Sequence, residues 1–127
     1  MKPLALNNVH PDIKFYPSGL ITLSARVVKL LGIKEGDVIN VMTEDKEHYL
    51  YVQYRSPLGK FSGKCLKHKR GSHYMRVYYK DLARAMIGLN KGEEAYFRIG
   101  EPISSNGQLL LPIITRINLY HDKKTTL

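Results

Sequence analysis

The chain has 127 residues, of which 43% are hydrophobic and 24% charged, so a single globular domain with its own core fits better than a disordered chain. Twenty Lys and Arg against eleven Asp and Glu give a formal net charge of +9. This surplus favours an anionic partner, nucleic acid before a membrane surface. Cys65 is the only cysteine, which excludes an internal disulfide and a cysteine-only metal site.

The first half of the chain carries signals for a run of short elements. In order, the pattern predicts a lead-in arm over residues 1–11, extended chain over 13–16, a strand over 20–23, a helix over 25–31, and strands over 38–43 and 48–55. Pro17, Ser18 and Gly19 form a turn signal between the first two strands. Ser24 is a predicted N-cap, and Gly32 supplies the left-handed residue that ends the helix.

The second half repeats this order. The predicted elements are strands over 64–69 and 74–79, a helix over 82–87, strands over 95–100 and 108–117, and a tail over 120–127. Asp81 is the candidate N-cap and Gly88 the residue that ends the helix. The pair Asn106-Gly107 predicts a turn in the loop between the last two strands. Because Pro112 cannot donate to a strand ladder, we expect the last strand at a sheet edge or at a bulge.

An offset of 56 residues brings the two halves into register. Gly32 then falls on Gly88 and Gly36 on Gly92, apolar positions coincide, and the second hairpin is longer by about four residues near 101–104. A helix of about seven residues is not stable alone, and each half has one uncovered apolar sheet face. We therefore predict two halves, 12–58 and 59–119, that pack together as one domain.

The positive charge is concentrated in the second half. Residues 1–58 carry seven basic and six acidic side chains, whereas residues 59–127 carry thirteen and five. Strand alternation predicts that Met75, Val77 and Tyr79 point into the core. Their neighbours Tyr74, Arg76 and Tyr78 should then point outward, among most of the basic residues of this half.

The segment over residues 18–41, SGLITLSARVVKLLGIKEGDVINV, resembles the AbrB family, which includes the MazE and SpoVT groups. The best match is LGIKEGD, at residues 31–37. The resemblance implies a mainly β protein with short helices: a swapped-hairpin β-barrel formed here as an intrachain pseudo-dimer. It also implies DNA binding, because most family members are transition-state regulators or antitoxins.

The two arginine positions of the family motif are filled in only one half. Leu20 and Val28 stand at these positions in the first half, whereas Arg76 and Arg84 stand at them in the second. The resemblance and the charge distribution therefore point to the same half as the DNA-contacting one. Nine residues are the candidate nucleic-acid contacts: Lys64, Lys67, Lys69, Arg70, Tyr74, Arg76, Tyr78, Lys80 and Arg84.

These observations predict a DNA-binding protein, a transcriptional regulator, that faces DNA with strands because its helices are too short to fill a groove. Arg76 is the best candidate for reaching a base edge, since its planar fork can bind bidentately. RNA is an alternative ligand, because basic residues among tyrosines also suit single strands. Another alternative is a protein-interaction module, antitoxin-like or accessory to a mobile element, that does not bind DNA. Two pseudo-dimers could also associate into a homodimer.

Enzymatic activity is not expected. The five histidines are scattered without metal-ligand spacing, and Cys65 has no evident base partner. The chain has no glycine-rich phosphate loop and no paired-carboxylate signature, so we expect no cofactor. No apolar run approaches the ~18 residues of a membrane span, and residues 1–11 lack the apolar core of a signal peptide. The sequence thus predicts a cytoplasmic protein that does not bind membranes.

Overall fold

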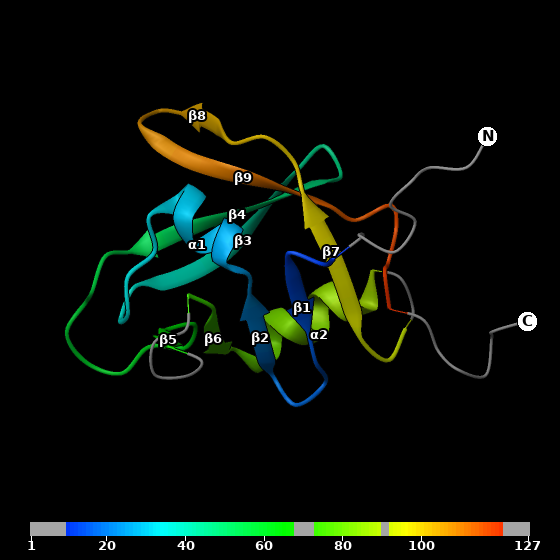
Figure 1. Cartoon of the computed structure of the whole chain (residues 1–127), viewed down its shortest axis with the longest axis horizontal. Helices are drawn as coiled ribbons and strands as arrows, with labels where there is room; N and C mark the ends of the chain where they lie inside the picture. The colour runs from blue at the N-terminus through cyan, green and yellow to red at the C-terminus, as the bar shows by residue number, and fades with distance from the viewer. Residues whose placement is uncertain (1–9, 68–72, 90–91, 121–127) are drawn as a thin grey trace, which may run out of the picture.

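The computed structural model describes residues 10–67, 73–89 and 92–120, which form a mainly β structure with two short helices (Figure 1). The helices are α1 (Ala25–Leu31) and α2 (Lys80–Gly88). The strands are β1 (Ile13–Phe15), β2 (Leu20–Leu23), β3 (Val38–Glu44), β4 (Glu47–Tyr54), β5 (Cys65–Lys67), β6 (Met75–Tyr78), β7 (Ala95–Ile99), β8 (Ile103–Ser105) and β9 (Gln108–Ile114). The predicted mainly β class with short helices is confirmed.

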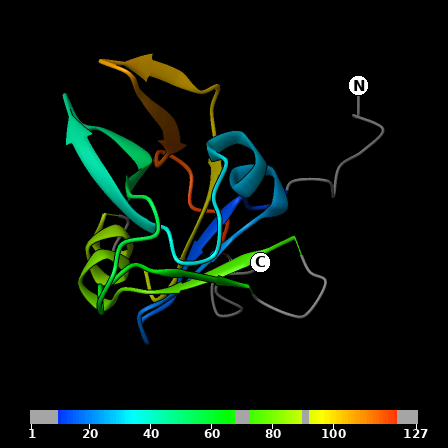
Figure 2. The same cartoon turned by 90° about the vertical axis from the view of Figure 1, so that its left-hand side faces the viewer.

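The strands form one curled antiparallel sheet in the order β3-β4-β9-β7-β1-β2-β6-β5, with β8 paired to β9 (Figure 2). A bridge between Val38 and Lys64 brings the two ends of this order together. Two backbone bonds flank it, from the Ile39 N–H to the Gly63 carbonyl at 3.0 Å and from the Cys65 N–H to the Asp37 carbonyl at 2.8 Å. The sheet therefore curls into a half-barrel that surrounds the core.

The strand pairings of the two halves correspond. The β1–β2 pair of the first half has its counterpart in β5–β6, and the β3–β4 pair has its counterpart in β7–β9. The halves join through β2–β6, where Ile21 lies opposite Val77, and through β4–β9. In addition, β1 pairs with β7 of the other half. In the same way, Val38 of β3 is bridged to Lys64, directly before β5. Strands of residues 12–58 thus pair directly with strands of residues 59–119.

The core lies between the curled sheet and the two helices. Alternate strand residues point into it, and the Phe15 and Phe97 rings meet there with centroids 6.1 Å apart. Met75 and Val77 are buried and Tyr79 packs against the core from its edge, as the alternation predicted. Burial of these apolar side chains is the main driving force that holds the strands together.

Helix α1 has the predicted bounds and caps. The Ser24 side chain accepts from the Val27 N–H, and Gly32 is left-handed at the end of the helix. Helix α2 differs from its prediction. It begins directly after β6, because the Ala83 N–H bonds the Tyr79 carbonyl at 2.9 Å, so Tyr79 rather than Asp81 is the N-cap.

Asp81 therefore lies inside the first turn of α2, where its negative charge interacts favourably with the positive end of the helix dipole. The other end of α2 also departs from the prediction. Gly88 is still helical, and Leu89 follows as a right-handed C-cap.

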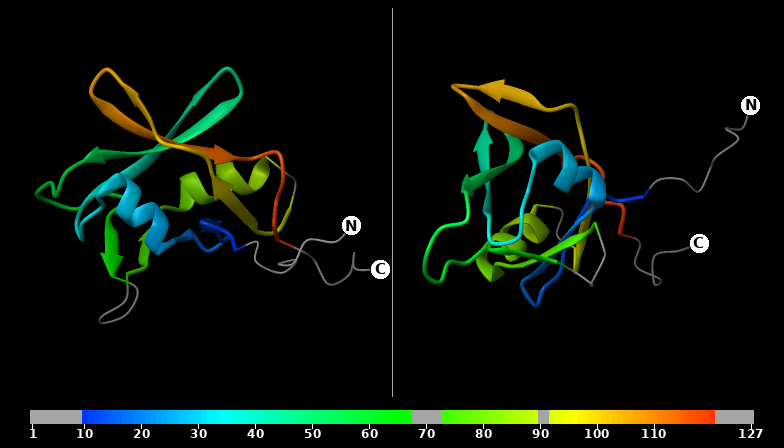
Figure 3. Two further views of the ribbon diagram at one scale, coloured as in Figure 1. Left: turned by 45° about the horizontal axis from the view of Figure 1, so that its top comes forward. Right: turned by 60° about the vertical axis from the view of Figure 1, so that its left-hand side comes forward.

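The segment expected to be a loop before the last strand contains β8, which pairs with β9 around the Asn106-Gly107 turn. Both turn residues have positive φ, as a tight two-residue hairpin requires. This hairpin and the β3–β4 hairpin diverge at their far ends (Figure 3).

Of the two positions expected for the strand of Pro112, a sheet edge or a bulge, the edge is wrong, because β9 lies between β4 and β7. The residue is tolerated because it lies where β9 changes its partner. Before it, β9 pairs with β8, and after it with β7, while residues 100–102 belong to neither strand. The missing N–H of Pro112 thus falls next to an interruption of the ladder.

Candidate nucleic-acid interface

The outer face of β6 carries the aromatic and basic side chains expected to point outward. Met75 and Val77 are buried, while Tyr74 and Tyr78 are 54% and 56% exposed on the opposite face. Arg76 lies between the two tyrosines with the same orientation. The structure therefore brings together three of the nine sequence candidates on one surface.

Arg76 is held in the middle of the sheet. Its backbone lies opposite Thr22 of β2 on one side and Leu66 of β5 on the other. The Arg76 Nε is buried and has no hydrogen-bond partner among the described residues. Arg76 as a whole is only partly buried, so the terminal nitrogens of its guanidinium, rather than the enclosed Nε, are the donors that an incoming acceptor could reach.

Lys64, directly before β5, and Lys67, at the end of β5, differ in their surroundings. Lys64 is partly buried, and its Nζ donates to the Gly59 carbonyl at 2.6 Å. Lys67 is exposed at the end of β5, and its backbone N–H donates to the Glu35 carboxylate at 3.1 Å. The Lys64 ammonium keeps donors for a second acceptor, since a lysine has three. Lys67 lies opposite the buried Met75, so its side chain is on the other face of the sheet from Arg76.

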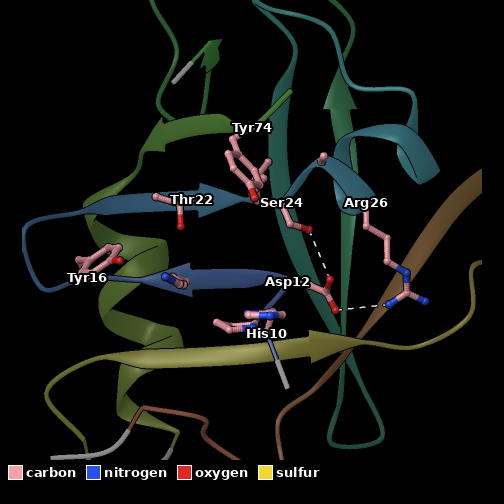
Figure 4. A pocket seen from close by; sticks show the side chains of 11 residues that line it. His10, Asp12, Tyr16, Thr22, Ser24, Arg26 and Tyr74 are labelled. Carbon is pink, nitrogen blue, oxygen red and sulfur yellow. Dashed lines mark hydrogen bonds and ion pairs between the residues drawn. The ribbon is translucent and has the colours of Figure 1, made fainter. Parts of the chain in front are cut away.

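The remaining sequence candidates are not all on this surface. Lys80 is exposed at the start of α2, and Arg84 is exposed further along the same helix. Helix α2 packs behind β1 and β2, on the side of the sheet opposite to the view in Figure 4. The helix position thus separates Arg84 from Arg76. Lys69 and Arg70 lie outside the described residues.

A second group of outward side chains lies on β1 and β7 and was not among the sequence candidates. The Lys14 Nζ lies 5.1 Å from the centre of the Tyr96 ring, and Tyr16 contacts the same ring edge-on. The Tyr96 hydroxyl donates to the Glu94 carboxylate, and burial followed by this bond raises the pKa of Tyr96. The outward position of Lys14 and Tyr16 could have been found from the same alternation that was used for β6.

A pocket of about 520 Å³ opens between these two groups (Figure 4). The pocket is lined by β1 and residues 10–12 before it, the end of β2, the start of α1, and Tyr74 before β6. Asp12 lies at its base, where one carboxylate oxygen accepts from the Ser24 hydroxyl and the other accepts from Arg26 and from the Ile99 N–H. This pocket was not anticipated from the sequence, because its walls come from segments far apart in the chain.

The motif LGIKEGD has a structural role at Asp37. This carboxylate is almost completely buried and accepts from the Lys34 N–H, the Arg55 guanidinium, and the Ser56 N–H and hydroxyl. Burial by itself would raise the pKa of Asp37, but these hydrogen bonds outweigh it and hold the pKa below its ordinary value. Asp37 thus fixes the turn before β3 and is not available to a ligand.

Cys65 is buried in the core. Burial, followed by the negative charge of Asp37, raises the pKa of its thiol to about 12, so the reactive thiolate form is suppressed. No group of three or more potential metal-ligating side chains occurs in the described part of the chain. Among the same residues, no helix is both long and apolar enough to cross a membrane.

No family model, curated protein or solved structure matches the chain.

Proposed function

We propose that the protein binds duplex DNA through the outer face of β6 and the adjoining part of β5. The observation that carries the proposal is the projection of Arg76 and Tyr78 from β6, and of Tyr74 directly before it, to one surface. This surface belongs to a segment without acidic side chains, since residues 56–80 contain no Asp or Glu. A sheet face that combines arginine, lysine and tyrosine meets both the charge and the hydrogen-bonding groups of a nucleic-acid backbone.

The proposed roles follow from the position of each side chain. Arg76 is central and can present its guanidinium fork to a base edge. Lys64, which shares the outer face with Arg76 by alternation along the sheet edge, can neutralise a phosphate, while the hydroxyls of Tyr74 and Tyr78 can donate to phosphate oxygens. We place Arg84 outside the interface, because α2 lies behind the sheet.

For the fold we infer two AbrB-like halves that form a swapped-hairpin pseudo-dimer. Corresponding strands pair within each half, and Ile21 lies opposite Val77, the position 56 residues later, where the halves meet. Each half also contributes a strand to the other half's sheet. These pairings support the inference, which further places the proposed DNA surface beside the join between the halves. A role as a transcriptional regulator would follow from sequence-specific binding there.

Titration of fluorescent duplex DNA over a salt series tests the proposal. For the wild type we expect the binding constant to fall linearly with salt on a log–log plot, because binding releases counterions. Arg76→Ala should weaken binding by about 1–3 kcal/mol and reduce discrimination between sequences if Arg76 reads a base. If it contacts a phosphate instead, the slope should flatten by roughly 0.9.

The matched control is Arg84→Ala, which removes the same kind of side chain from the helix behind the sheet and should leave binding nearly unchanged. Absence of salt-dependent duplex binding at low salt, or equal binding by Arg76→Ala and wild type, contradicts the proposal. Tighter binding of single-stranded RNA or DNA than of duplex would favour the RNA alternative. A stoichiometric protein partner bound without nucleic acid would favour an interaction module.

A further inference from the structure

The pocket between β1, β2 and the start of α1 has the size and the chemistry of a ligand site. Its volume of about 520 Å³ lies within the roughly 300–1,000 Å³ of small-molecule sites. It combines basic side chains with two aromatic ones, and the contacts below show which of these groups are already used within the protein.

The basic side chains of the pocket are Lys14, Arg26 and His10. Of the described residues that line the pocket, Asp12 is the acidic one. Both of its carboxylate oxygens already accept hydrogen bonds from within the protein. The ion pair with Asp12, 3.4 Å long, uses one nitrogen of the Arg26 guanidinium. The other nitrogens and the Lys14 ammonium remain as donors for an anion, and Arg26 is held in place by the pair.

The aromatic side chains lie at two ends of the pocket. Figure 4 shows Tyr74 above β2 and Tyr16 at the turn end of β1. Tyr16 is held by its edge-on contact with Tyr96, whose ring also lies under the Lys14 ammonium. Tyr74 is more than half exposed, so one flat side of a planar ligand could stack on it.

We propose that this pocket binds a nucleoside 5′-phosphate, with the phosphate at the Lys14 ammonium and the base against Tyr74. A free mononucleotide and the phosphorylated end of a strand share this chemistry. The site goes beyond the proposed duplex interface and does not require it. The two surfaces have Tyr74 in common, but Arg76 is not part of the pocket lining.

Calorimetric titration with dAMP and dTMP tests the assignment, with deoxyadenosine and inorganic phosphate as the probes that lack one part of the ligand. We expect each incomplete probe to bind at least about tenfold more weakly, a loss of about 1.4 kcal/mol. A short oligothymidylate with and without a 5′-phosphate distinguishes the two sources of the ligand. Binding of the phosphorylated strand above that of dTMP assigns a strand end, and the reverse order assigns a free nucleotide.

Two variants test the named contacts. Lys14→Met and Tyr74→Ala should each weaken mononucleotide binding about tenfold, while Lys46→Met, at the distant β3–β4 turn, should leave it unchanged. Thermal unfolding of each variant shows that it remains folded. Arg76→Ala should keep mononucleotide binding, so failure of duplex binding and failure of this proposal are separate results. The proposal is overturned if mononucleotides bind no better than inorganic phosphate, or if Lys14→Met and Tyr74→Ala both bind as the wild type does.

Discussion

At the scale of single residues, the buried carboxylate of Asp37 is the most heavily hydrogen-bonded acidic group of the described structure. It connects the turn before β3 to Arg55, whose guanidinium also donates to the carbonyls of Leu31 and Gly32 at the end of α1. One ionised side chain thus joins a helix end, a turn and the chain after β4. A buried charge of this kind is stable only while its partners remain in place.

Asp37→Asn should lower the free energy of unfolding at pH 7 by about 2–3 kcal/mol, because it removes the charge that Arg55 and the two N–H groups are arranged to meet. The wild type should also lose stability in acid. The pKa of Asp37 is lowered in the folded state, so its contribution is complete above the ordinary carboxyl pKa of roughly 3.9 and is lost as the pH falls below it.

Urea unfolding from pH 7 to pH 3 measures both effects, and the acid-induced loss should be smaller in Asp37→Asn. The control is Asp45→Asn in the exposed β3–β4 turn, which we expect to change stability by less than about 0.5 kcal/mol. Equal acid sensitivity of wild type and Asp37→Asn would show that Asp37 is not the responsible group.

At the scale of elements, the two helices follow the paired strands β2 and β6 but begin differently. Helix α1 starts with the side-chain cap of Ser24, whereas α2 has no side-chain cap and starts directly from β6. Asp81 in the first turn of α2 supplies a favourable charge instead of a hydrogen bond. The same element is therefore stabilised in two ways within one chain.

Ser24→Ala should destabilise the protein by about 1 kcal/mol, because the Val27 N–H loses its acceptor. Ser24→Thr is the matched variant, since threonine retains a capping hydroxyl and should recover most of the loss. Chemical denaturation at neutral pH measures the difference. If alanine and threonine at this position gave equal stabilities, the cap would be ruled out as the cause.

At the scale of the whole molecule, the sheet depends on one close approach between its two ends. Gly63 has φ +87°, and a Cβ at this residue would lie 2.8 Å from the Ile39 carbonyl oxygen and 3.0 Å from the Tyr79 ring. Its own carbonyl accepts the Ile39 N–H, and its N–H donates to the Tyr78 carbonyl. A side chain at residue 63 would therefore separate β3 from the start of β5.

Gly63→Ala should lower the free energy of unfolding by about 2–4 kcal/mol, through the positive φ together with the clash. Gly88→Ala is the control, because that glycine is helical and its Cβ would meet nothing within 4 Å. This variant should be neutral or stabilise by up to about 1 kcal/mol. Thermal and urea unfolding compare the two, and a Gly63→Ala variant as stable as the wild type would mean that the ends of the sheet need not meet.

Local signals were sufficient to predict most elements. The alternation of apolar residues located β2 and β6, and Ser24 and Gly32 fixed both ends of α1, because strand periodicity and helix capping depend on residues close together in the chain. The same signals failed at the start of α2 and at β8. In α2 the preceding strand runs directly into the helix, and β8 forms only because β9 lies beside it.

The sequence by itself determined which residues alternate inward and outward and where the charge is concentrated. Only the tertiary structure decided that the helix of Arg84 packs behind the sheet, on the side opposite to Arg76, and that Lys14, Arg26 and Tyr74 line one pocket. The physical reason is that alternation and capping are local, whereas the neighbours of a strand depend on which pairing closes the core. That choice depends on residues from both halves at once.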